Sequence, residues 1–97
     1  MNYQITQVEK NNLENNFLNK RYISVEKDAQ SLVEKGFNQP WIYNVLAVTY
    51  ARQKKFKNAE KMFLKVISFE PNDFDHYFNL ANLYRETKNF KNCIEAL

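Results

Sequence analysis

Residues 43–59 read YNVLAVTYARQKKFKNA, and residues 77–93 read YFNLANLYRETKNFKNC, so the second stretch begins 34 residues (77 − 43) after the first. Both stretches place large and small residues at the same positions. Eight residues of the first stretch are identical in the second: Tyr43, Leu46, Ala47, Tyr50, Lys54, Phe56, Lys57 and Asn58 return as Tyr77, Leu80, Ala81, Tyr84, Lys88, Phe90, Lys91 and Asn92. A fixed period of this length with helical spacing of apolar residues is typical of stacked helix–turn–helix units. The sequence therefore predicts an all-α solenoid of antiparallel helical hairpins.

The middle of the chain supplies one complete hairpin, at residues 38–71. Its first helix is predicted from four residues spaced i, i+3, i+4 and i+7, namely Tyr43, Leu46, Ala47 and Tyr50. A turn is expected at residues 53–55. The second helix follows from another apolar stripe, formed by Phe56, Ala59, Phe63, Val66 and Ile67.

Polar residues and prolines mark the ends of these helices. Asn38 is expected to cap the first helix, with Pro40 in its first turn, where a missing N–H costs little. Pro71 is expected to end the second helix, because proline disfavours helical backbone in the residue before it. Asn72 and Asp73 are then expected to cap the next helix.

Two less regular units flank the middle one. In residues 4–37 a good second helix is predicted from Tyr22, Val25, Ala29 and Leu32, whereas its partner, with Leu13 and Phe17, fits only if the turn is one residue shorter. Residues 72–97 form an incomplete unit, because Lys91–Leu97 supplies barely two helical turns. Either the chain is part of a longer protein, which we favour, or Leu97 meets a second copy.

Composition excludes several classes of protein. The chain has 97 residues, a net charge of +3 and one cysteine. The modest charge, carried mostly by lysine, makes nucleic acid an improbable partner. The single cysteine favours a reducing compartment, and neither a signal peptide nor a membrane span is recognisable. The sequence therefore predicts a cytoplasmic protein without a membrane partner.

The paired stretches resemble the tetratricopeptide repeat family. The middle unit matches its pattern through Tyr43, Leu46, Ala47, Tyr50, Phe56, Ala59, Phe63 and Pro71, and the third unit through Tyr77, Leu80, Ala81, Tyr84, Phe90 and, in place of alanine, Cys93. The resemblance covers residues 4–97. It implies a protein-interaction module without catalysis or a cofactor of its own, which binds a peptide or a helix along its concave side.

In that family the first helix of each hairpin lines the concave side, so the resemblance also suggests where a ligand lies. Residues that point away from the core stripe are the candidates, and they mix aromatic anchors, amides and charges: Trp41, Asn44, Val48, Arg52, Phe78, Asn79, Asn82 and Arg85. Val45 and Glu86 lie beside them. For Trp41, packing against the first unit is an equally good interpretation.

Two further hypotheses remain beside the peptide-binding one. Bacterial proteins that begin with Asn- and Lys-rich repeats of this kind often continue into a sulfotransferase or glycosyltransferase domain, and these repeats would then present its substrate. Alternatively, the incomplete third unit stacks on another copy of the chain, which makes the protein a self-associating structural unit.

Other chemistry-bearing residues have simpler explanations. His76, which follows Asp73 and Asp75 in the same short stretch, suggests a metal site, but one histidine with two carboxylates at a helix N-terminus is a poor closed site, so no metal is predicted. Cys93 occupies a small-residue position in the core stripe. The basic stripe of Lys57, Lys61 and Lys65 is interpreted as a solvated helix face, with an acidic partner or RNA as the alternative.

Overall fold

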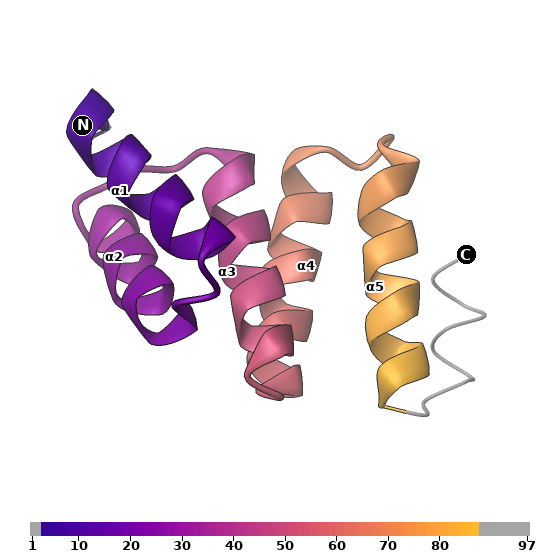
Figure 1. The fold of residues 1–97 in the computed structure, drawn as a ribbon. Helices are drawn as coiled ribbons and strands as arrows, with labels where there is room; N and C mark the ends of the chain where they lie inside the picture. The colour runs from indigo at the N-terminus through magenta and orange to yellow at the C-terminus, as the bar shows by residue number, and fades with distance from the viewer. Residues whose placement is uncertain (1–2, 88–97) are drawn as a thin grey trace.

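The computed structural model describes residues 3–87, and this part of the chain contains five helices: α1 (Gln7–Leu18), α2 (Tyr22–Glu34), α3 (Pro40–Arg52), α4 (Phe56–Phe69) and α5 (Phe74–Glu86). The helices α1 and α2 form one antiparallel hairpin, α3 and α4 form the next, and α5 follows (Figure 1). The predicted all-α helical repeat is thus confirmed. None of the helices in the described residues is long and apolar enough to cross a membrane.

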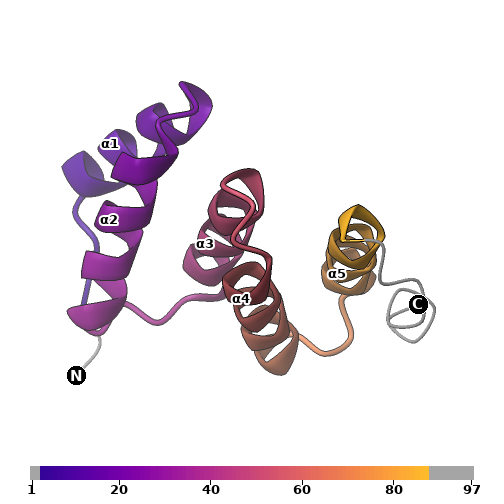
Figure 2. The ribbon, with the colours of Figure 1, turned by 90° about the horizontal axis from the view of Figure 1, so that it is seen from below.

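The hairpins follow one another along the long direction of a molecule that measures 41 × 27 × 18 Å. Figure 2, which shows the stack from below, places α3 and α4 between the first hairpin and α5. The most extensive helix contact joins α3 to α4, and α4 also packs on α5. Because each unit touches only its neighbours, the core is a continuous layer along the stack.

The predicted apolar stripes form this core. In α3 the buried stripe residues are Tyr43, Leu46, Ala47 and Tyr50, and in α4 they are Ala59, Phe63 and Val66. Alanine at positions 47 and 59 is fully buried, and its small side chain allows the two helices to approach closely. The first hairpin contributes Leu13, Val25, Ala29 and Leu32 to the same cluster.

The start of α3 differs from the prediction. The N-cap is Gln39, whose side chain makes no capping hydrogen bond, while Pro40 occupies the first turn as expected. Proline holds the residue before it in extended backbone, so the helix begins immediately after Gln39 and Asn38 lies one position too early to cap it. Asn38 instead accepts a hydrogen bond at Oδ1 from the hydroxyl of Tyr43, at 2.8 Å. At α5, Asp73 is the cap as predicted and Asn72 is not.

The prediction of a shorter first turn is wrong. Residues 19–21 connect α1 to α2 and residues 53–55 connect α3 to α4, so both turns have three residues. Lys20 and Lys54 both adopt left-handed backbone, with φ of 58° and 62°. The backbone hydrogen bonds of the two turns also recur at the 34-residue offset. The first hairpin therefore keeps the turn of the second.

What changes in the first hairpin is the position of its apolar residues. Leu13 and Phe17 stand 34 residues before Ala47 and Ala51, one position round the helix from the Leu46 and Tyr50 stripe. Leu13 is buried, and Phe17 packs against the core at its edge. The first hairpin therefore reaches the core through large side chains at positions where the second hairpin has alanines.

Polar contacts fasten the first hairpin to the second. Glu26 of α2 accepts hydrogen bonds from Gln53 Nε2 at 3.0 Å and from Lys55 Nζ at 2.8 Å. The bond from Lys55 holds the pKa of Glu26 below its usual value, against the opposing effect of partial burial. Gln30 Nε2 donates to the hydroxyl of Tyr50 at 2.6 Å. The turn between α3 and α4 is thereby tied to α2.

The beginning of the described chain is fastened in the same way. Thr6 and Glu9 form a capping box at the start of α1. The hydroxyl of Tyr3 donates to Glu9 Oε1 at 2.6 Å, and Lys35 Nζ lies 3.6 Å from Glu9 Oε2. The bond from Tyr3, supported by the backbone N–H of Thr6, lowers the pKa of Glu9 from 4.5 to about 2. The Glu9 carboxylate of α1 thus contacts both Tyr3, before α1, and Lys35, at the end of α2.

This carboxylate predicts a specific dependence of stability on pH. Because folding lowers the pKa of Glu9, its contribution is fully present above pH 4.5 and is lost as the pH falls towards 2. We expect Glu9→Gln to unfold at lower urea concentration than the native chain at neutral pH, and the difference to vanish near pH 2. Glu14→Gln, at an exposed position of the same helix, is the control. If both substitutions lowered the stability equally at neutral pH, the contacts of the Glu9 carboxylate would not be the source of the effect.

Several sequence predictions fall outside the described residues. They concern Phe90, Cys93 and the short helix expected at Lys91–Leu97, together with any contact of Leu97 with another copy.

Candidate functional site

A pocket of about 160 Å³ opens between α3 and α5. Its lining from α3 is Val48, Ala51 and Arg52; α4 contributes Phe63; α5 contributes Asn79, Asn82, Leu83 and Glu86. Phe63 and Leu83 are buried, whereas Arg52 and Glu86 are exposed. The pocket therefore combines an apolar floor with a polar rim that carries one charge of each sign.

Four of the eight predicted site residues line this pocket. They come from two helices: Val48 and Arg52 from α3, and Asn79 and Asn82 from α5. Asn79 and Asn82 are three residues apart, so they lie on one face of α5. Both are half-buried, and neither side chain forms a hydrogen bond with another described residue. Their amides are thus available to a ligand.

The other four predicted residues lie outside the lining of the pocket. Trp41 is half-buried and packs edge-on against Phe37, with ring centroids 5.3 Å apart, which fits the interpretation that it packs on the first unit. Asn44 is half-buried, and its Oδ1 atom is covered without a hydrogen-bond partner among the described residues. Phe78 is 56% exposed, and Arg85 is exposed as well.

Three of the lining residues are not among those that the sequence predicts for the site. Phe63 belongs to the core stripe of α4, as predicted, and it also lines the pocket. Leu83 has no equivalent in the repeated pattern, since Thr49 stands at its position in α3. Ala51 is too small to give a signal. The position of α5 against α3 and α4 decides whether such residues face a ligand, and periodicity does not supply it.

The basic stripe is exposed, as expected. Lys57, Lys61 and Lys65 are all exposed on α4. The ammonium group of Lys65 lies 5.6 Å from the ring centroids of both Tyr43 and Phe69, so this lysine also covers two aromatic rings. That contact explains one member of the stripe without a ligand.

The fold and the pocket define an all-α helical repeat with a groove between successive units. Residues 42–73 and residues 62–95 each match a model of the tetratricopeptide repeat. These two matches support membership of the tetratricopeptide repeat family, as the resemblance indicated. No curated protein matches the chain significantly. The alternative hypothesis, that these repeats precede a sulfotransferase or glycosyltransferase domain, has no support from these matches.

Tetratricopeptide repeats generally mediate protein–protein interaction, and domains built from them are generally non-catalytic. The general function of such a chain is therefore to bind protein partners.

Proposed function

We propose that the groove between α3 and α5 binds an extended segment of a protein partner. The observation that carries this proposal is that Val48, Arg52, Asn79 and Asn82 meet in one pocket, although the two pairs lie about thirty residues apart in sequence. In this proposal the units are residues 4–37, 38–71 and 72–97, and the partner contacts the first helix of the second and third units.

The size and lining of the pocket suggest what enters it. A volume of about 160 Å³ is close to the roughly 150 Å³ of an engineered apolar cavity that binds benzene. That space suits one medium-sized aliphatic side chain. Val48, Phe63 and Leu83 supply the apolar contacts that such a side chain needs. An aliphatic anchor on the partner is therefore favoured over a charged one.

The rim suggests how the rest of the segment is held. An asparagine amide both donates and accepts, so Asn79 and Asn82 are suited to pair with the N–H and C=O groups of an extended backbone. Arg52 and Glu86 flank them with opposite charges. Phe78 and Arg85, exposed on α5, extend the proposed contact beyond the pocket. An extended peptide uses this arrangement better than a helix, whose backbone groups are already paired.

Peptides selected from a random display library on the folded chain provide the test. We expect them to contain an aliphatic residue, and to bind the Lys57→Gln/Lys61→Gln variant as tightly as the native chain, because those lysines are outside the groove. Their affinity should also change little with salt. Loss of binding in the lysine variant, with steep salt dependence, would instead place the binding surface on the basic stripe and overturn the proposal.

A further inference from the structure

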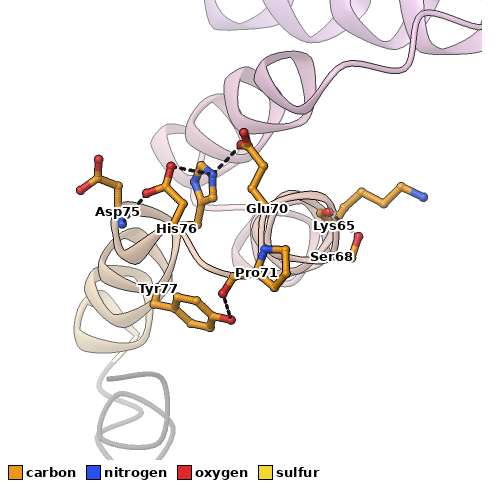
Figure 3. Close-up of polar contacts among 8 residues, drawn as sticks. Lys65, Ser68, Glu70, Pro71, Asp75, His76 and Tyr77 are labelled. Carbon is orange, nitrogen blue, oxygen red and sulfur yellow. Dashed lines mark hydrogen bonds and ion pairs between the residues drawn. The ribbon is translucent and has the colours of Figure 1, made fainter.

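The corner between α4 and α5 brings together three side chains that can ligate a metal. Glu70 follows the last residue of α4, Asp73 caps α5, and His76 lies in the first turn of α5. His76 Nε2 is 2.8 Å from Glu70 Oε1 and 3.5 Å from Asp73 Oδ2. One donor atom from each residue lies within 4.8 Å of the other two. Figure 3 shows the His76 ring directed towards Glu70, while the carboxylate of Asp75 points away.

The sequence suggested a different and weaker group. The sequence places His76 beside Asp73 and Asp75, and those three residues alone make a poor closed site. The structure replaces Asp75 with Glu70, which reaches the cluster from the preceding helix across the bend at Pro71. The three ligands therefore come from both sides of the corner.

We propose that Glu70, Asp73 and His76 form a binding site for a divalent transition-metal cation such as Zn²⁺. Four ligands in tetrahedral arrangement, each about 2.0–2.2 Å from the cation, lie roughly 3.3–3.6 Å from one another. The 3.5 Å distance from His76 Nε2 to Asp73 Oδ2 falls in that range. The 2.8 Å contact with Glu70 Oε1 is a hydrogen bond, and a cation that replaced the shared proton would lengthen it by about half an ångström. One imidazole and two carboxylates form a ligand set that suits Zn²⁺ and its neighbours better than Ca²⁺, which prefers oxygen alone.

The ligands are held in place by the structure around them. Asp73 Oδ1 accepts the backbone N–H of Asp75 at 3.0 Å, which directs the other oxygen towards His76. The backbone N–H of Asp73 donates to the carbonyl of Glu70, and the hydroxyl of Tyr77 donates to the carbonyl of Pro71 at 2.8 Å (Figure 3). The His76 side chain is only 12% exposed. The Glu70 and Asp73 side chains are 47% and 44% exposed, so the histidine is the most firmly held of the three ligands.

The charge of the corner favours a divalent cation. Among residues 3–87, no lysine or arginine forms an ion pair with Glu70 or Asp73, so two carboxylates remain to neutralise the ion. The N-terminus of α5 carries a partial positive charge that repels a cation, and the negative charges of Glu70 and Asp73 offset it. His76 Nδ1 is buried and has no acceptor in the described structure, so the outer hydrogen bond that strengthens many metal-bound histidines is absent. We therefore expect this three-ligand site to bind a cation more weakly than a site whose histidine has such an outer hydrogen bond.

A bound cation would join the end of α4 to the start of α5 and so fix the corner between the second and third units. The test is calorimetric titration of ZnCl₂ into tag-free protein, with the thermal unfolding midpoint measured in parallel. A Cys93→Ser background removes the thiol as a competing ligand. We expect one ion to bind and the midpoint to rise with zinc concentration, because the ion binds the folded corner.

Isosteric variants separate ligation from folding. Asp73→Asn keeps a capping side chain and Glu70→Gln keeps a hydrogen-bond partner, yet each removes a carboxylate ligand. Losing an outer-shell partner costs about 10–100-fold in metal affinity, so each of these variants, and His76→Gln, should lose at least about tenfold. Asp75→Asn, an acid in the same turn that points away, is the matched control and should bind like the parent. Absence of zinc binding in the parent, or equal affinity in all variants, would overturn the proposal.

Discussion

Replacing Tyr50 by alanine is expected to lower the free energy of unfolding by about 3–5 kcal/mol. Tyr50 is only 7% exposed, and its ring fills the core between α2, α3 and the following turn. From the sequence alone, truncating an aromatic side chain in the core is expected to lower the free energy of unfolding by about 2–4 kcal/mol. The structure adds the hydrogen bond from Gln30 Nε2 and the Lys55 ammonium group 6.0 Å from the ring centroid. Urea unfolding followed by circular dichroism measures the loss.

The Tyr50→Phe variant is the matched control. It keeps the ring but removes the hydroxyl that accepts from Gln30, so we expect a loss of about 1 kcal/mol. The two variants thus separate packing from the polar link between the hairpins. A Tyr50→Ala chain as stable as the native one would mean that the helical register of α3 is wrong.

The second large effect concerns binding. Asn79→Ala combined with Asn82→Ala is expected to weaken the library-selected peptides by about tenfold or more, because each amide hydrogen bond contributes about 0.5–1.5 kcal/mol. The thermal midpoint should stay unchanged or rise slightly. Neither amide bonds another described residue, and alanine is a better helix former than asparagine.

A control with the same chemistry accompanies this double variant. Asn58→Ala with Asn72→Ala also removes two exposed amides, but from positions outside the pocket lining, one on α4 and one in the corner before α5. Fluorescence anisotropy with labelled peptides compares the affinities. Equal affinity of the two double variants would show that the groove amides do not contact the partner.

The repeated stretch predicts much of the fold, because its information is local. The recurrence of Tyr43 as Tyr77 sets the helix period and the hairpin order, and Pro71 sets the end of α4. The left-handed backbone of Lys20 and Lys54 has no such signal. Lysine does not favour left-handed backbone, and the hydrogen bonds that close each turn decide which residue adopts it.

The candidate site was only partly predictable for a related reason. Helical spacing shows which face Asn79 and Asn82 occupy, but not that Leu83 joins them in the pocket. Likewise, nothing in the spacing of Glu70 and His76 shows that a bend at Pro71 brings them to 2.8 Å. Both outcomes depend on the angle between neighbouring helices, which is set by packing across the whole interface.

Backbone amide chemical shifts, recorded by NMR while a selected peptide is titrated into ¹⁵N-labelled chain, test the central claim most directly. The account predicts that the largest changes map to Val48, Arg52, Asn79 and Asn82, on the two helices that line the groove. Changes confined to α4 around Lys57 and Lys61, with the groove residues unaffected, would contradict it.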